Sequence, residues 1–181
     1  VQYNIEAVTD FATAVNLSYH PYFNLDENSS TVNEQKVKLY ARHWLEQDED
    51  FCLTGKFKST KFSDYDFSDW EPVSQVWNKE DGYDQTFVVD KNSAELSIIA
   101  EAMSSDGNLH MQVHSSEPVV HFYTGKWIPA VKGKKGLTYG PFSGYCFETH
   151  QYPNAINIPS FPNTILRPGE LYRQTTIFNF L

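Results

Sequence analysis

The chain has 181 residues and a formal net charge of −9 at pH 7, with 40% hydrophobic and 20% charged residues. This length suits one domain with a substantial core, or part of a larger domain. No apolar run approaches the roughly 20 residues of a membrane-spanning helix, and the longest cationic cluster is the short stretch Lys132–Lys135. Because phosphate binding requires clustered cations, we expect neither nucleic acid nor a membrane as partner, whereas a neutral, hydroxyl-rich ligand fits the composition.

Strand signals dominate the first two-thirds of the chain. Val1–Val8 alternates apolar and polar residues, which predicts a strand already under way and indicates a cut N-terminus. The acidic, aromatic stretch Lys58–Trp70 is expected to be an irregular loop or an inserted arm. Leu96–Ala102 and Leu109–Ser115 flank a segment that contains Asp106-Gly107. That dipeptide tolerates the positive φ of a tight turn, so these two runs predict a β-hairpin.

The remainder of the chain continues the same pattern. Val119–Thr124 and Leu171–Leu181 are predicted strands, and Pro153–Pro168, with four of the nine prolines, is predicted to be an extended surface loop. No segment shows a helical period over 12 or more residues. The sequence therefore predicts an all-β fold, a large antiparallel β-sandwich that forms one domain or one piece of a domain.

Three segments place polar side chains among aromatic residues. In the first, His20 precedes Pro21 and two aromatics; an imidazole can exchange a proton near neutral pH, although a histidine in such a setting is often structural. In the second, Asp84 follows a predicted turn at Asp81-Gly82, at the mouth of a strand, where a carboxylate can accept hydrogen bonds from ligand hydroxyls. The alternative interpretation of this segment is a simple turn.

The third segment, Gly144–Pro153, contains Glu148 inside an apolar and aromatic run. Burial there raises the pKa of a carboxyl group, which is how a glutamate becomes a general acid or base. The alternative is a glutamate at a strand edge that points to solvent. Local pattern alone leaves both interpretations open.

Cysteine and histidine spacings do not indicate a metal centre. Cys52 and Cys146 match no metal or redox motif and are expected to be reduced thiols of a cytoplasmic protein, with a single disulfide as the alternative. His110 and His114 face the same side of a predicted strand, but four residues of strand span about 13 Å, too far for one ion. We therefore expect no metal site.

Five ordered segments together resemble the aldose 1-epimerase (galactose mutarotase) family. VNLSYHPYFNL at 15–25 is similar to the family's V-N-L-T-N-H-S-Y-F-N-L, and DGYDQTF at 81–87 to its D-G-Y-D-H-N-F. HFYTGK at 121–126 follows Q-F-Y-T-G-N, and FETHQYPNAIN at 147–157 follows L-E-T-Q-H-Y-P-D-A-P-N. LRPGELYRQTT at 166–176 follows L-R-P-G-E-x-Y-x-x-T-T. The resemblance covers essentially the whole chain.

The resemblance implies a galactose mutarotase-like β-sandwich that interconverts the α and β anomers of free aldohexoses without a cofactor. It also implies roles for six residues. His20 would be the general acid and Glu148 the general base, while the sugar would be bound by Asp84, Tyr22, Phe23 and His121.

This chain departs from the family pattern in several respects. Gln85 stands where the family has histidine, His121 where it has a sugar-contacting glutamine, and Lys126 where it has asparagine. Family chains are about twice as long, and nothing here matches the Asn-Arg pair and second histidine of their N-terminal half. We therefore expect residues 1–181 to be the C-terminal portion of a single epimerase domain.

Three alternatives remain open at this stage. One is a carbohydrate-binding or regulatory relative with weak or no catalysis. Another is a hexose-6-phosphate epimerase, against which the scattered arginines argue. The third is the mutarotase portion of a fused, bifunctional enzyme.

Overall fold

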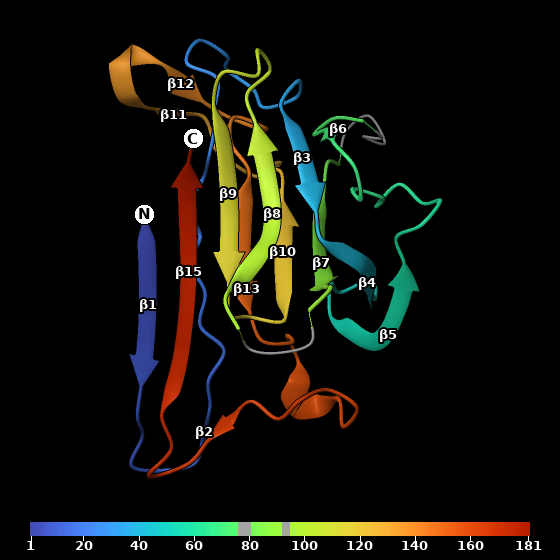
Figure 1. Ribbon diagram of the computed structural model, residues 1–181, viewed down its shortest axis with the longest axis vertical. Coiled ribbons are helices and arrows are strands. Elements are labelled where there is room, and N and C mark those ends of the chain that lie inside the picture. The colour runs from blue at the N-terminus through green and yellow to red at the C-terminus, as the bar shows by residue number, and fades with distance from the viewer. Residues whose placement is uncertain (76–80, 92–94) are drawn as a thin grey trace.

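The computed structural model describes residues 1–75, 81–91 and 95–181 and consists of antiparallel sheets (Figure 1). The larger sheet has six strands in the order β1-β15-β9-β8-β3-β6. Their bounds are β1 Gln2–Ala7, β15 Tyr172–Phe180, β9 His110–Ser115, β8 Ser97–Met103, β3 Lys36–Leu39 and β6 Glu71–Pro72. The first and last strands of the chain, β1 and β15, thus lie side by side at one edge (Figure 1).

The second sheet has five strands in the order β13-β10-β7-β4-β5. Their bounds are β13 Cys146–His150, β10 Val119–Tyr123, β7 Asp84–Val89, β4 Ala41–Gln47 and β5 Leu53–Ser59. Two small ribbons complete the architecture, β11 (Val131–Lys132) with β12 (Thr138–Tyr139) and β14 (Ile165–Leu166) with β2 (Thr13–Ala14).

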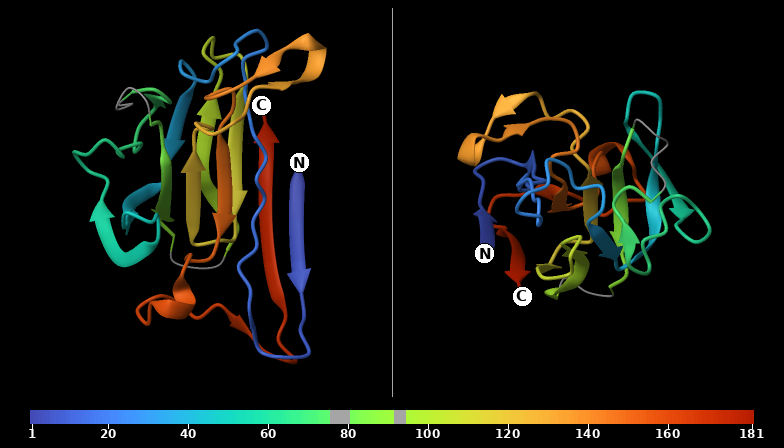
Figure 2. Two further views of the ribbon diagram at one scale, coloured as in Figure 1. Left: turned by 180° about the vertical axis from the view of Figure 1, so that it is seen from behind. Right: turned by 90° about the horizontal axis from the view of Figure 1, so that it is seen from above.

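The two large sheets pack face to face around one main core (Figure 2). The six-stranded sheet contributes Ile99, Met111 and Phe178, and the five-stranded sheet contributes Phe87, Phe122 and Phe147, all less than 2% exposed. Successive residues of a strand point to opposite faces of its sheet, so each strand that fills this core also presents an outer row. The predicted all-β sandwich is confirmed.

Most predicted strands are present. Val1–Val8 contains β1, Val119–Thr124 contains β10 and Leu171–Leu181 contains β15. The predicted hairpin is the β8–β9 pair, and Gly107 in its turn has φ +75°. Positive φ costs glycine nothing, which is why Asp-Gly marked this turn correctly.

The two predicted loops are more structured than expected. In 58–70, Lys58 and Ser59 complete β5, and the buried Phe67 packs in the main core against Tyr83 and Phe122. The proline-rich segment contains β14 and a short 3₁₀ turn, Ala155–Asn157. With the 3₁₀ turn Lys134–Gly136, this is the only helical structure in the described residues, and neither turn is long enough to cross a membrane.

Candidate functional site

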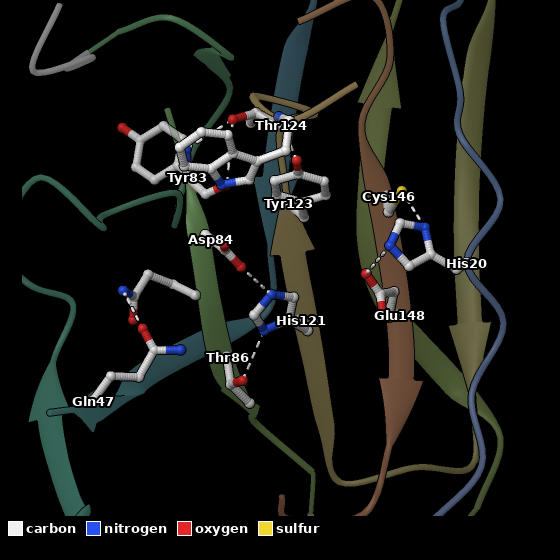
Figure 3. A network of polar contacts seen from close by, with 12 residues as sticks. His20, Gln47, Tyr83, Asp84, Thr86, His121, Tyr123, Thr124, Cys146 and Glu148 are labelled. Atoms are coloured by element: carbon white, nitrogen blue, oxygen red, sulfur yellow. Dashed lines mark hydrogen bonds and ion pairs between the residues drawn. The ribbon is translucent and has the colours of Figure 1, made fainter. Parts of the chain in front are cut away.

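Polar side chains form a row on the outer face of the five-stranded sheet, opposite the core (Figure 3). Strands β7, β10 and β13 are adjacent, and their register places His121 directly across from both Thr86 and Glu148. Tyr123 lies across from Asp84 and Cys146 in the same way. Because directly paired residues share a face, the three strands together present Asp84, Thr86, His121, Tyr123, Cys146 and Glu148.

The strand that carries Asp84 begins directly after the predicted turn. Gly82 has φ +64°, and the backbone N–H of Tyr83 donates to Oγ1 of Thr124 at 2.8 Å. The Thr124 N–H donates in return to the carbonyl oxygen of Tyr83 at 2.9 Å. These contacts fix the start of β7, so Asp84 is the first residue of its strand, at the strand mouth that the sequence predicted.

His20 comes from the segment 15–25, which runs beside β13 and is tied to it at two points. At one end, the Asn16 amide donates to the carbonyl oxygen of Gln151 at 3.0 Å and accepts from its N–H at 2.8 Å. At the other end, Phe23 and Tyr145 exchange two backbone hydrogen bonds of 2.8 and 3.0 Å. His20 lies between these two ties, opposite the middle of β13.

This arrangement brings the predicted acid and base into contact. Nε2 of His20 lies 3.3 Å from Oε1 of Glu148, and Nδ1 lies 3.2 Å from Sγ of Cys146 (Figure 3). These three side chains are close enough together to hold a metal ion. One ion takes only one ring nitrogen, however, whereas the two contacts use opposite nitrogens of His20. The geometry fits a hydrogen-bonded chain better than a metal centre.

Burial changes the acid–base properties of β13. The side chain of Glu148 is only 18% exposed, and loss of solvation raises its pKa above the usual value of a glutamate. His121 and His20 act in the opposite direction, while the nearby Asp84 carboxylate adds to the increase. Burial also raises the pKa of the Cys146 thiol. A carboxyl group with a raised pKa, beside an imidazole, is suited to exchange protons near neutral pH.

Asp84 and His121 form a second histidine–carboxylate pair. Nε2 of His121 lies 2.7 Å from Oδ1 of Asp84, and Nδ1 lies 2.9 Å from Oγ1 of Thr86. The Asp84 side chain is 42% exposed, whereas His121 is 18% exposed. One carboxylate of the site is therefore open to a ligand while the histidine behind it is held in the sheet.

Aromatic rings surround the two pairs. Tyr22 is half exposed, and its ring centroid lies 4.8 Å from that of His20 and 6.3 Å from that of Tyr123. Phe23 points elsewhere: its ring packs on Phe178 at 4.7 Å, and with Tyr22 it lines an adjacent pocket. Tyr22 thus joins the polar cluster, whereas Phe23 does not contact it, and its role in sugar binding stays a prediction.

The positions where this chain departs from the family pattern lie around the cluster. The Gln85 amide donates to Oε1 of Gln47 at 2.9 Å. Lys126 forms an ion pair with Asp81 and lies over the ring of Trp127 at 4.8 Å. The charge that Lys126 brings to this end of the sheet is thus paired within the chain.

Sequence reasoning missed three members of the cluster, Thr86, Tyr123 and Cys146, of which Tyr123 follows the predicted His121 by two residues. Cys146 precedes Glu148 by two residues and Thr86 follows Asp84 by two. Because alternate residues of a strand share one face, Cys146 lies on the same face as Glu148, and Thr86 on the same face as Asp84. Both cysteines are free, as expected, with Cys52 exposed and Cys146 buried.

Comparison with known proteins finds matches over nearly the whole chain. A family model described as aldose 1-epimerase matches residues 1–179. Human galactose mutarotase is 36% identical over 183 aligned residues, which cover 98% of this chain and 53% of that protein. An aldose 1-epimerase of Escherichia coli (strain K12) is 27% identical, with 97% and 53% covered.

Solved structures give the same result for the fold. A GalM/aldose epimerase homologue from C. elegans superposes with a TM-score of 0.87 at 28% identity, over 99% of this chain and 56% of that chain. A galactose 1-epimerase from Lactobacillus acidophilus gives a TM-score of 0.83 at 21% identity, with 99% and 52% covered. The chain thus spans about half the length of the relatives that it matches.

Proposed function

We propose, because the chain belongs to the aldose 1-epimerase family, that it supplies the acid–base groups for interconverting α and β anomers of free aldohexoses such as galactose and glucose. The observation that carries this proposal is the contact of His20 with Glu148 at 3.3 Å, beside polar groups that share one face of the sheet. The reaction needs one group that accepts a proton and one that donates a proton within reach of the same carbon atom.

The proposed chemistry moves protons only. The Glu148 carboxylate takes the proton of the C1 hydroxyl while the His20 imidazolium gives a proton to the ring oxygen, and the C1–O5 bond breaks. The free aldehyde rotates about C1–C2, and the ring closes from the other face with the two roles reversed. The C1 hydroxyl oxygen and the ring oxygen are both bonded to C1, so two adjacent side chains can exchange protons with them. Each group contributes about 10²–10⁴-fold to the rate.

The remaining side chains orient the sugar in this proposal. Asp84 has an exposed carboxylate that accepts hydrogen bonds from sugar hydroxyls, and His121 lies behind it. Tyr22 offers an aromatic face beside His20 on which a sugar ring can pack. Phe23 would contribute only through the adjacent pocket, which it lines together with Tyr22.

We further propose that residues 1–181 are the C-terminal part of one epimerase domain, whose other part supplies further sugar contacts. The matched relatives, which are about twice as long, support this view. A free hexose as the substrate fits a cytoplasmic location, and the proton balance of the reaction requires no cofactor.

Polarimetry of the full-length protein tests the function. Freshly dissolved α-D-galactose or α-D-glucose should approach its equilibrium rotation much faster with the protein than in buffer alone. A rate equal to that of buffer would overturn the proposal. Sugar binding without any rate enhancement would identify a carbohydrate-binding relative instead.

A further inference from the structure

His121 is engaged through both ring nitrogens. A carboxylate only accepts hydrogen bonds, so the 2.7 Å contact with ionised Asp84 places a hydrogen on Nε2. The hydroxyl of Thr86, 2.9 Å from Nδ1, can either donate or accept. The same arrangement therefore holds a neutral imidazole, with Thr86 as donor, and an imidazolium, with Thr86 as acceptor. His121 can gain or lose a proton without moving.

The charge of His121 acts on Glu148. The two residues are directly paired across β10 and β13, so their side chains rise from neighbouring points on one face. A positive charge on His121, like one on His20, lowers the pKa of Glu148. A residue of the sheet is thus a charge partner of the proposed base, in addition to His20.

The other titratable groups around His121 can be named by element. Strand β7 presents Asp84, which attracts a positive charge on His121. Strand β13 presents Glu148 and, with its ring centroid 6.5 Å from that of His121, His150. Burial lowers the pKa of His150 to about 4, so this ring is neutral near pH 7. The remaining groups are Tyr123 on β10 itself, Cys146 on β13 and His20 on the adjoining segment.

We propose that His121 is a positioning residue for both halves of the site: it holds the Asp84 carboxylate in place and, when protonated, favours the carboxylate form of Glu148. This inference rests on the proposed function, because it gives the site a built-in way to keep its base ionised as the pH falls. A positive charge on His121 opposes the protonation of Glu148, which would remove the base from the proposed reaction.

The substitution H121Q separates the two effects. Glutamine has an NH2 group that can donate to Asp84 and an amide oxygen that can accept from Thr86, and it never carries a charge. In the ¹³C-glutamate-labelled protein, with the Glu148 carboxyl signal assigned through E148Q, the titration midpoint of Glu148 should move to higher pH by about one unit in H121Q. H43Q is the matched control, because His43 is exposed on β4, and it should leave that midpoint in place.

Activity gives an independent second test. In H121Q the acid limb of the pH–rate profile should move to higher pH with KM nearly unchanged. In H121A the limb should move in the same direction and KM should also increase. An unchanged Glu148 midpoint in H121Q would overturn the inference, even in an active enzyme. A shifted midpoint in a protein without epimerase activity would support the inference while removing the proposed function, because the titration requires no turnover.

Discussion

The site contains two histidine–carboxylate pairs that are built differently. His121 and Asp84 both belong to the sheet, on adjacent strands, and their contact of 2.7 Å is backed by Thr86. His20 belongs to a segment outside the sheet and meets Glu148 at 3.3 Å. The exposure of the carboxylates also differs: Asp84 is 42% exposed, whereas Glu148 is 18% exposed.

This difference separates positioning from proton transfer. An exposed carboxylate, fixed by a short hydrogen bond, is suited to bind hydroxyls in one orientation. A buried carboxyl group with a raised pKa, beside a more exposed imidazole, is suited to change its protonation state. Each pair therefore predicts its own kinetic signature, and substitutions can show whether the assignment is right.

The largest effect is expected for E148Q. Removing the base should lower kcat by about 10²–10⁴-fold with a small change in KM, since the amide keeps the shape of the side chain. Polarimetry at several sugar concentrations measures both constants. E49Q, in an exposed turn, is the control and should behave as wild type. Nearly full activity in E148Q would remove Glu148 from the chemistry.

A smaller effect of a different kind is expected for D84N. Loss of a charged acceptor for sugar hydroxyls costs about 1.5–3 kcal/mol, which corresponds to roughly a 10- to 100-fold increase in KM. The same polarimetric titration gives this value. If D84N instead lowered kcat as far as E148Q and left KM unchanged, the roles of the two pairs would be reversed.

Loosening the His20 segment should have a still smaller effect. N16A removes the two hydrogen bonds between Asn16 and the backbone of Gln151, each worth about 0.5–1.5 kcal/mol. With one tie lost, His20 is held less firmly opposite Glu148, and kcat should fall by about tenfold or less. N108A is the control. It removes the hydrogen bond that Asn108 donates to Asp106 within the β8–β9 turn, and it should leave kcat unchanged. Equal losses in both variants would point to general destabilisation.

The two pairs also show which features of the fold and the site could be predicted from the sequence. The β8–β9 hairpin followed from alternation and one Asp-Gly turn, because local chemistry determines it. The contact of His20 with Glu148 joins distant parts of the chain, and only the ordered motifs suggested it. The burial of Phe67 within a predicted loop had no local signal, since it depends on Tyr83, which precedes β7, and on Phe122 in β10.

The smallest predicted effect concerns stability, and its sign distinguishes the two carboxylates. Burial raises the pKa of Glu148 in the folded protein above its unfolded value, so the folded state binds the proton more tightly. Stability is therefore lost as the pH rises from the unfolded pKa through the folded pKa, and it stays lower above that range. At neutral pH, E148Q should unfold at a higher temperature than wild type, by roughly 2–4 °C for about 1 kcal/mol.

Thermal unfolding of the two proteins at several pH values measures this difference. The advantage of E148Q should disappear below about pH 4, where glutamate is protonated in both the folded and unfolded states. D84N provides the comparison, because Asp84 is more exposed and accepts a hydrogen bond from His121, so its replacement should give no such gain. If E148Q were less stable at neutral pH, the contact with His20 would outweigh the cost of burying the charge. Glu148 would then resemble Asp84 as a fixed partner rather than a poised base.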